Sequence, residues 1–261
     1  MKMGISCFIF YNLIMNLFTK ILSYILTVIH YFFFSLTLLI FHPIQWLAFN
    51  LGGQKAHKKV VDIMNFFLVK TMFFLGSSVV FNNKHQLPDN TPLILVSNHQ
   101  STYDIPPIYW YLRKYSPKFV SKKELGKGIP SVSYNLTHGG NVLIDRKNPR
   151  QSLIELSKFG EYIEKNKFSA VIFAEGTRSK DGNPKPFKEK GLQMMVKKIP
   201  SSYIVPISIN NSWKIVQFGA FPLGIFNKIT FEVHKPIKSD SLPFDELFQK
   251  VEKAVKDGIH V

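Results

Sequence analysis

The sequence predicts an α/β fold, a mixed sheet covered by helices and preceded by an N-terminal apolar helical membrane anchor. Two observations support this prediction. From residue 82 onward, short apolar runs alternate with longer amphipathic runs, which is the pattern of strands covered by helices. Before that point the chain is apolar, and Lys2 and Lys20 are the only charged residues within 1–54. We therefore expect a membrane-anchoring helical region over 1–81 and an α/β domain over 82–261.

The N-terminal region contains a run that matches the thickness of a bilayer. Residues 21–41 read ILSYILTVIHYFFFSLTLLIF and carry no formal charge. A helix of this length extends roughly 30 Å, which is the thickness of the hydrocarbon core. Shorter apolar runs cover 4–18 and 63–81. The first of these has the length of a signal peptide, but no small-residue cleavage site follows it, so we do not expect secretion.

The sequence leaves two arrangements of this anchor open. Residues 21–41 either cross the membrane once or lie in one leaflet as part of a re-entrant helical hairpin. If they cross once, the cluster of Lys55, Lys58 and Lys59 places the following domain on the cytoplasmic side. We therefore expect a protein of the cytoplasmic membrane whose α/β domain faces the cytoplasm.

The strands and helices of the domain follow from its apolar patterns. Strands are expected where a short apolar run is bounded by polar residues, and helices where apolar residues recur every three or four positions. The expected strands cover 92–97, 118–121, 141–144, 170–174, 203–209 and 229–233, and the expected helices cover 103–114, 150–167, 191–198 and 244–256. In such sheets, ligands bind where strands give way to loops at their carboxyl ends.

The charge of the chain restricts its partners. A net charge of +16 favours a polyanionic partner, which could be nucleic acid, an anionic membrane surface or a phosphorylated substrate. Nearly all of the positive charge is lysine, and the chain lacks an arginine-rich helix or an aromatic stacking platform, so no nucleic acid is expected. A basic domain beside an apolar arm instead fits membrane lipid. Cys7, the single cysteine, leaves no internal disulfide or thiolate metal cluster.

A histidine and an aspartate follow the first expected strand of the domain. His99 and Asp104 lie in the segment SNHQSTYD, where the strand gives way to a helix. An imidazole can act as a general base near neutral pH, and a nearby carboxylate can hold it in the proton-accepting tautomer. Alternatively, Asn98 or Ser101 caps the helix and Asp104 stabilises its N-terminus. Taken alone, this segment leaves catalysis and capping equally open.

Two of the chain's four arginines follow further expected strands. Arg146 comes after NVLID, and Arg178 ends the segment EGTR. In a chain that otherwise uses lysine, an arginine at a strand end suggests bidentate binding of phosphate oxygens. Gly176 lets the backbone approach a ligand, Thr177 supplies a hydroxyl, and Glu175 is expected to orient Arg178 or a substrate hydroxyl. The alternatives are a surface ion pair and an ordinary turn.

Two other segments carry weaker signals. Lys122 and Lys123 follow the strand at 118–121 and could contact phosphate, although a solvated basic face is the simpler interpretation. Pro206 lies in an apolar segment that also reads as an edge strand containing a proline. The sequence contains no metal-ligand cluster, P-loop, dinucleotide fingerprint or Gly-x-Ser-x-Gly elbow. A base without a protein nucleophile would have to activate a hydroxyl of the substrate.

Four segments in order resemble the four sequence blocks of the 1-acyl-sn-glycerol-3-phosphate acyltransferases. They are NHQSTYD (98–104), GNVLIDR (140–146), FAEGTR (173–178) and VPISI (205–209). Each block is weak by itself, but their order and spacing together are specific. The resemblance extends from about residue 82 to residue 237, and members of the family also carry an N-terminal helical membrane anchor.

The resemblance implies an activity and roles for these residues. A fatty acyl group would pass from acyl carrier protein or acyl-coenzyme A, as co-substrate and without a further cofactor, to the sn-2 hydroxyl of lysophosphatidate, giving phosphatidate in phospholipid biosynthesis. His99 would be the general base and Asp104 its orienting partner. The phosphate would be held by Arg146 and residues 175–178. Pro206 would border the acyl-chain channel.

Three alternatives to this activity remain at the sequence level. A sister acyltransferase would act on glycerol 3-phosphate, another lysophospholipid or an aminolipid. A membrane-bound hydrolase would transfer the acyl or phosphoryl group to water, and a basic membrane-binding protein would do no chemistry. The segment GKGIPS (126–131) replaces a bulky apolar run that is usual in the family, which leaves the acyl chain length open.

Overall fold

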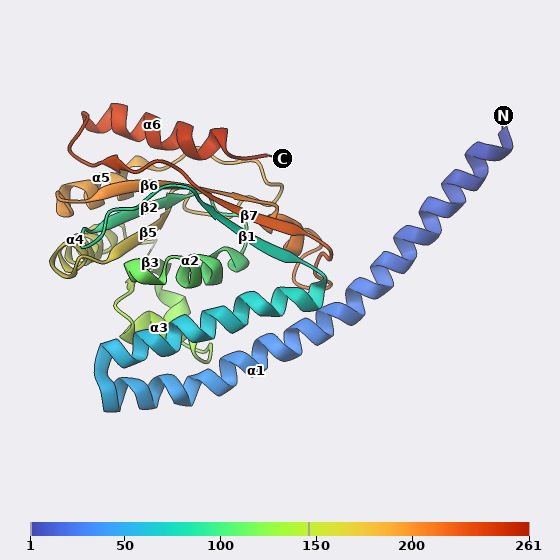
Figure 1. The fold of residues 1–261 in the computed structure, drawn as a ribbon, viewed down its shortest axis with the longest axis horizontal. Helices are drawn as coiled ribbons and strands as arrows, with labels where there is room; N and C mark the ends of the chain where they lie inside the picture. The colour runs from blue at the N-terminus through green and yellow to red at the C-terminus, as the bar shows by residue number, and fades with distance from the viewer. Residues whose placement is uncertain (1, 146, 261) are drawn as a thin grey trace.

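The computed structural model describes the chain over residues 2–145 and 147–260, with side chains described from residue 18 onward. Within this part of the chain the strands are β1 (Ser78–Asn83), β2 (Leu93–Ser97), β3 (Pro117–Lys122), β4 (Val142–Ile144), β5 (Ser169–Phe173), β6 (Tyr203–Asn210), β7 (Lys228–Val233) and β8 (Ile237–Lys238). The α-helices are α1 (Lys2–Lys70), α2 (Ile105–Tyr111), α3 (Val132–His138), α4 (Pro149–Asn166), α5 (Glu189–Lys198) and α6 (Phe244–Asp257). The predicted α/β class with a preceding apolar helix is confirmed (Figure 1).

The strands form one mixed sheet, in the order β1-β7-β6-β2-β5-β3-β4, with β8 beside β6. The five strands from β6 to β4 run parallel, whereas β7 is antiparallel to β6 and parallel to β1. Because parallel strands point the same way, the carboxyl ends of β2, β3, β4, β5 and β6 share one edge of the sheet. This edge is where the sequence placed its candidate site residues.

The central strand β2 shows how the sheet joins two helical layers. Leu93 and Leu95 are buried in a core shared with α1 and α2, whereas Ile94 and Val96 are buried in a second core shared with α4, α5 and α6. This alternation is the period of two that a strand imposes on its side chains. Every residue of β2 is buried, as expected for a strand covered on both faces. Figure 1 shows the two helical layers above and below the sheet.

Four elements of the domain differ from the sequence prediction. The single helix expected over 103–114 is a 3-10 turn (Thr102–Asp104), the helix α2 and a second 3-10 turn (Arg113–Tyr115). The strands β1 and β8 and the helix α3 were not predicted. The predicted boundary between residues 81 and 82 falls inside β1, whose residues pair with β7 from Ser78 onward. The apolar run over 63–81 hid this strand, because only Gly76 and Ser77 separate the helical segment from the strand there.

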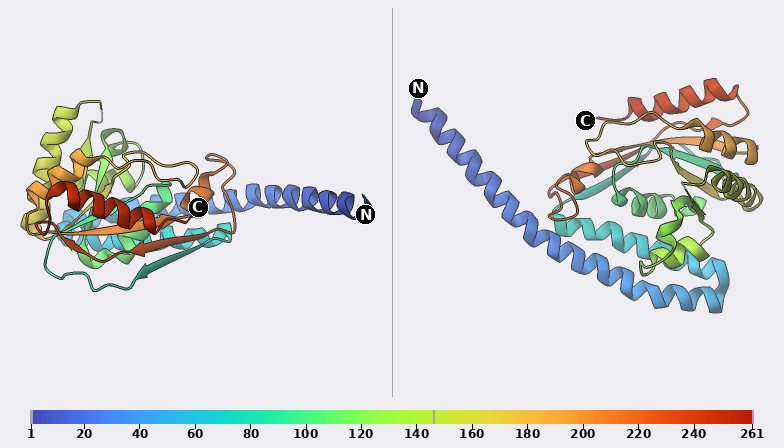
Figure 2. Two further views of the ribbon diagram at one scale, coloured as in Figure 1. Left: turned by 90° about the horizontal axis from the view of Figure 1, so that it is seen from above. Right: turned by 180° about the vertical axis from the view of Figure 1, so that it is seen from behind.

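The helix α1 is bent into a hairpin that packs along the domain. Gly53, with φ of 64°, interrupts the helical backbone, and the chain returns toward the sheet after it. A left-handed φ of this kind is readily adopted by glycine, which has no Cβ. Figure 1 and both views of Figure 2 show that the N-terminal part of α1 extends beyond the domain, while the rest lies against it.

The polarity of α1 is inverted relative to a helix on a soluble protein. Its buried side includes the polar residues Ser23, Thr27 and His30, none of which is more than 2% exposed. Its outer side is apolar, and Val28 and Phe32 are 58% and 61% exposed. Over Phe18–Leu75 the helical segment is apolar and long enough to cross a membrane by length and composition. A helix that buries hydroxyls and exposes aliphatic and aromatic side chains is suited to lipid rather than water.

The buried hydroxyls of α1 are hydrogen-bonded to the domain. The backbone N–H of Leu223 donates to Oγ1 of Thr27 at 2.8 Å, and Ser23 Oγ donates to the Leu223 carbonyl. The ring of His30 bridges the Thr71 carbonyl and the Tyr103 hydroxyl, at 3.0 Å and 3.1 Å. Tyr103 adjoins Asp104, so the anchor contacts the turn that carries the candidate site.

We predict that Thr27→Val destabilises the protein in detergent micelles by about 1–3 kcal/mol, because it leaves the buried N–H of Leu223 without its acceptor. The measurement is the free energy of chemical unfolding. Val28→Thr is the matched control, since Val28 is exposed and has no such contact, and its unfolding free energy should stay within about 0.5 kcal/mol of wild type. Equal stability of the two variants would contradict the assigned hydrogen bond.

Candidate active site

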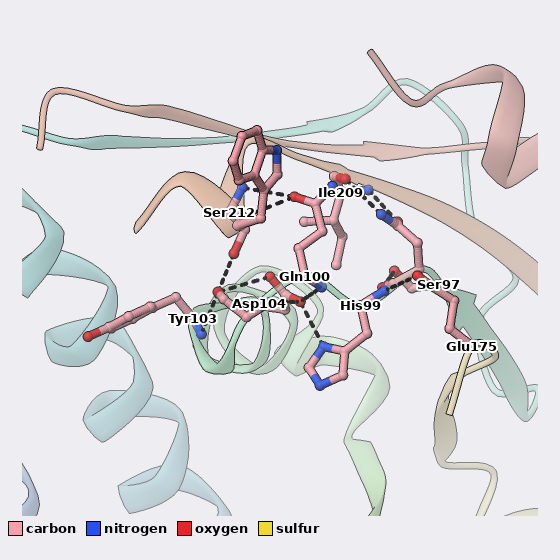
Figure 3. A network of polar contacts seen from close by, with 11 residues as sticks. Ser97, His99, Gln100, Tyr103, Asp104, Glu175, Ile209 and Ser212 are labelled. Atoms are coloured by element: carbon pink, nitrogen blue, oxygen red, sulfur yellow. Dashed lines mark hydrogen bonds and ion pairs between the residues drawn. The ribbon is translucent and has the colours of Figure 1, made fainter. Parts of the chain in front are cut away.

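The turn after β2 is fixed to β6 and to the segment that follows β6. The side-chain amide of Asn98 donates to the Ile209 carbonyl at 2.9 Å and accepts from the Ile209 N–H at 2.8 Å, which joins this turn to β6. The Gln100 side-chain oxygen accepts from the N–H of Ser212 at 2.9 Å. Both contacts lie at the shared carboxyl edge of the sheet (Figure 3). Residues more than a hundred positions away therefore determine where the turn points.

Asp104 orients His99 and caps the following turn at the same time. Its Oδ2 accepts from Nδ1 of His99 at 2.8 Å and from the backbone N–H groups of Gln100 and Ser101 at 2.7 Å and 2.9 Å. Ser101 completes a capping box by accepting from the Tyr103 N–H. From the sequence, helix capping and catalysis were alternative roles for this segment. In the structure, the buried Asp104 carboxylate has the geometry for both.

The other nitrogen of His99 is available for proton transfer. Because Nδ1 donates to Asp104, Nε2 carries the lone pair. Nε2 has no hydrogen-bond partner among the described residues, and the side chain remains 16% exposed. The imidazole stacks on the ring of Phe173 at a centroid distance of 3.9 Å and an interplanar angle of 13°. Phe173, at the end of β5, was not identified from the sequence, where it read as an ordinary strand residue.

Glu175 ties the turn after β2 to the loop after β5. Its two carboxylate oxygens accept from the backbone N–H of His99 at 2.8 Å and of Lys185 at 2.9 Å. The sequence suggested that Glu175 orients Arg178 or a substrate hydroxyl, but the structure assigns it these two backbone contacts. Burial raises the pKa of Glu175, and the two N–H donors oppose this effect.

The loop after Glu175 presents Thr177 and Arg178 beside the same turn. The Ser179 N–H donates to the His99 carbonyl at 2.8 Å, which holds the loop against the histidine. Lys185 donates from Nζ to the Thr177 hydroxyl at 3.2 Å and to the Arg178 carbonyl at 2.8 Å. The Arg178 side chain is exposed and forms no ion pair with any described residue. Its guanidinium can therefore bind an anionic ligand.

Gly176 brings a second lysine to this loop. Its φ is 71°, and a Cβ built at this position would lie 3.1 Å from Nζ of Lys188. The Lys188 side chain therefore passes over the backbone at Gly176, the one residue of the EGTR segment that has no side chain. Lys185 and Lys188 were not identified from the sequence, because nothing local relates a lysine-rich loop to the turn at residue 99.

Lys122 and Lys123 lie at the same edge of the sheet, and no contact of either with His99 or Asp104 is seen among the described residues. Lys122 ends β3, and its backbone pairs with Ile144 at the end of β4. Lys123 forms an ion pair with Asp145. Arg146, the next residue, lies outside the described residues. The shared edge thus carries further positive charge next to the loop of Arg178.

Pro206 lies away from His99. Its neighbours Val205 and Ile207 face the core shared with α1 and α2, so Pro206 faces the opposite side, where Ser208 bonds to the Val255 carbonyl of α6. Its role beside an acyl chain stays a prediction. The edge-strand interpretation is wrong, because β6 lies between β2 and β7. Proline is tolerated at this position because its nitrogen, which has no hydrogen to donate, faces the gap between β7 and β8. In this gap the Pro206 carbonyl accepts from the His234 N–H.

Within the part of the chain whose side chains are described, no three histidine, cysteine or acidic residues are grouped closely enough to hold a metal ion. The site instead combines a carboxylate-oriented imidazole with an exposed arginine and several lysines. Such a set can accept a proton from a hydroxyl and bind an anionic group near it.

The comparison with known proteins agrees with this geometry. The family model described as Acyltransferase matches residues 78–210. A 1-acyl-sn-glycerol-3-phosphate acyltransferase of Helicobacter pylori is 34% identical over 66% of this chain and 72% of its own length. The chain belongs to the 1-acyl-sn-glycerol-3-phosphate acyltransferase family. The resemblance read from the four sequence blocks is thereby confirmed.

Other members of the family differ in length. A chloroplastic 1-acyl-sn-glycerol-3-phosphate acyltransferase of Brassica napus is 33% identical over 64% of this chain, and the match spans 47% of the plant protein. The chain thus matches about half the length of that relative. The crystal structure of the 1-acyl-sn-glycerophosphate acyltransferase from Thermotoga maritima superposes with a TM-score of 0.76 and 26% identity, covering 92% of this chain and 95% of the other. The fold, including a long N-terminal helical segment, is therefore that of the acyltransferase family.

We predict that Glu175→Gln destabilises this acyltransferase by about 1–3 kcal/mol, because the amide nitrogen that replaces one oxygen would face a backbone N–H of His99 or Lys185. Chemical unfolding in detergent micelles measures the change. Glu189→Gln, at an exposed position in the first turn of α5, serves as the control and should remain within about 0.5 kcal/mol of wild type. If Glu175→Gln unfolded with the same free energy as wild type, the two contacts would not contribute to stability.

Proposed function

We propose that this protein transfers a fatty acyl group from an acyl thioester to the sn-2 hydroxyl of 1-acyl-sn-glycerol 3-phosphate, giving phosphatidate for phospholipid biosynthesis. The observation that carries the proposal is the free Nε2 of His99 beside the Arg178 loop, with Nδ1 held by Asp104 at 2.8 Å. The names of the relatives from Brassica napus, Helicobacter pylori and Saccharomyces cerevisiae support the same acceptor.

In the proposed reaction, Nε2 of His99 removes the proton of the acceptor hydroxyl while its oxygen attacks the thioester carbonyl carbon. A carbon–oxygen bond forms, and the tetrahedral intermediate collapses with cleavage of the carbon–sulfur bond. The proton held on Nε2 passes to the leaving sulfur, which restores the neutral imidazole. Asp104 stabilises the transient imidazolium, because its buried carboxylate already accepts from Nδ1. No enzyme nucleophile or further cofactor is required.

The phosphate of the acceptor binds at the loop after β5 in this proposal. The guanidinium of Arg178 supplies a planar pair of donors, and the ammonium groups of Lys185 and Lys188 lie on the same loop. Lys122, at the end of the neighbouring strand β3, extends the positive field along the edge, whereas the charge of Lys123 is balanced by Asp145. Phosphate binding by Arg146 stays a prediction from the sequence. The proximity of this loop to His99, through the 2.8 Å bond from Ser179, keeps the phosphate near the reacting hydroxyl.

The proposal includes a position at the membrane. The buried residues Ser23 to Gln45 of α1 lie along the domain, so a bilayer crossed by residues 21–41 would also enclose the charged domain packed against them. We therefore favour the arrangement in which this part of α1 lies in one leaflet. The domain would face the cytoplasm, where the acyl thioesters are available, and the lysines near the bend of α1 would contact anionic lipid.

We expect His99→Ala to lower kcat by a factor of about 10²–10⁴ while binding of the protein to lipid vesicles is unchanged, because the substitution removes only the base. The assay combines purified protein with lysophosphatidate and either acyl-coenzyme A or acyl carrier protein thioester. His85→Ala, at an exposed site in the loop that leads into the start of β2, is the control.

The same assay tests the acceptor. Glycerol 3-phosphate, other lysophospholipids and water are offered in parallel with lysophosphatidate. Preferred acylation of another acceptor would replace the proposed function by the corresponding sister activity, and release of free fatty acid without an acceptor would indicate a hydrolase. Full activity of His99→Ala would contradict the mechanism.

We expect Arg178→Lys to raise the KM for lysophosphatidate about tenfold with a smaller effect on kcat, because a point charge replaces the bidentate guanidinium. Steady-state kinetics with the acceptor varied measures the change. Arg113→Lys is the matched control, since Arg113 lies after α2 and stacks on Trp110 instead of facing the site. An unchanged KM in Arg178→Lys would remove Arg178 from the phosphate site.

A further inference from the structure

The segment between β6 and β7 exposes three large aromatic side chains. We name residues 217–226, which read QFGAFPLGIF, the aromatic loop. Phe218, Phe221 and Phe226 are 62%, 52% and 62% exposed, although their loop is otherwise anchored by buried residues such as Leu223. Scattered single apolar residues are common on protein surfaces, but three exposed phenylalanines within nine positions form a patch that favours an apolar partner.

The aromatic loop is continuous with the outer apolar face of α1. Phe221 packs edge-on against Tyr24 of α1 at a centroid distance of 5.2 Å. The hydroxyl of Tyr31 donates to the Ala220 carbonyl at 2.5 Å. The exposed residues Ile25 and Val28 lie on the neighbouring turns of the helix, and they are 54% and 58% exposed. Helix and loop therefore present one apolar surface, fixed by hydrogen bonds between them.

The far end of the aromatic loop is fixed against the end of the anchor. The N–H of Phe226 donates to the Leu75 carbonyl at 2.9 Å. Its ring lies over Gly76, where a built Cβ would be 2.3 Å from Phe226 Cδ1, so only glycine allows this approach. Phe73, in the preceding 3-10 turn, is 78% exposed. The apolar surface thus extends from α1 across the loop to the segment that leads into β1.

The near end of the aromatic loop begins at the catalytic turn. The 3-10 turn Ser212–Val216 precedes the loop, and the Gln100 side-chain oxygen accepts from the N–H groups of Ser212 and Trp213 at 2.9 Å and 3.4 Å. Ser101, which caps the turn of Asp104, also contacts the Ser212 hydroxyl. Contacts that fix the position of the aromatic loop therefore also fix the orientation of the turn that carries His99 and Asp104.

We propose that the aromatic loop is a second membrane-inserting element, whose phenylalanines enter the same lipid leaflet as the outer face of α1. This inference rests on the proposed membrane position of the protein. The occupant is lipid because the patch continues the apolar face of α1, and because exposed Lys20 and Lys228 flank it where lipid headgroups would lie. Insertion at two separate elements fixes the tilt of the domain, so that the site meets an acceptor lipid at the membrane surface.

Site-directed fluorescence tests the proposal directly. The native thiol is removed with Cys7→Ser, and an environment-sensitive label is attached in separate proteins to Phe218→Cys, Phe221→Cys, Val28→Cys and Ile154→Cys. Val28 reports the anchor, and Ile154, 47% exposed on α4, reports a solvent-facing apolar position. The labelled full-length proteins are bound to phosphatidylcholine vesicles that contain phosphatidylglycerol, with quenchers placed either on the lipid chains or in the water.

The expected result is that labels at 218 and 221 are quenched from the lipid chains as the label at 28 is, whereas the label at 154 is quenched from water. Labels at 218 and 221 that behave like the label at 154 would overturn the proposal. Protection from both quenchers, with a dimer in solution, would assign the patch to a second copy of the chain and would overturn it as well.

A binding measurement provides an independent test. Phe218→Ser combined with Phe221→Ser should weaken partitioning onto the same vesicles about tenfold, since two exposed aromatic rings lose their lipid contact. Ile154→Ser should have no effect. Activity toward acceptor presented in detergent micelles should be retained in both. Unchanged partitioning of the double variant would contradict the inference, whereas wild-type protein that binds vesicles but fails to acylate lysophosphatidate would contradict only the proposed function.

Discussion

The carboxylate of Asp104 is the group on which the active site depends. One oxygen receives the imidazole N–H of His99 and two backbone N–H groups within 2.9 Å, and the side chain is completely buried. Buried acceptors of this kind are fixed because each lost donor would leave an unsatisfied group in a region of low dielectric constant. The direction of the histidine ring, the start of α2 and the approach of the anchor through Tyr103 all follow from this position.

The parallel sheet supplies the second constraint. Because β2, β3, β4, β5 and β6 end at one edge, segments that are distant in sequence meet there without long connections. The basic residues of the loops after β3 and β5 therefore create a local excess of positive charge around one histidine. In a chain whose net charge is +16, this arrangement favours an anionic ligand.

Much of the fold and part of the site could be predicted from the sequence. The His99–Asp104 pair was accessible because both residues lie in one local segment, and the ends of β5 and β6 followed to within one residue from the apolar runs over 170–174 and 203–209. The contact between Glu175 and the N–H of His99 was not accessible, since it joins positions 76 apart through strand pairing. The edge-strand interpretation of Pro206 failed for a similar reason, because a sequence does not reveal which strands are interior. β1 was missed because it continues the apolar run of the anchor.

In the proposed reaction, the two contacts of Glu175 also set the spacing between the base and the anion-binding loop. One oxygen of its carboxylate accepts from the backbone N–H of His99, and the other accepts from Lys185, which donates to the Thr177 hydroxyl and the Arg178 carbonyl. These contacts couple the backbone at His99 to the loop that carries Arg178, so that their separation would act as a molecular ruler. For a phosphorylated acceptor, the ruler selects the number of bonds that separate the phosphate from the reacting hydroxyl. Regioselectivity would thus be determined by a residue that touches neither end of the substrate.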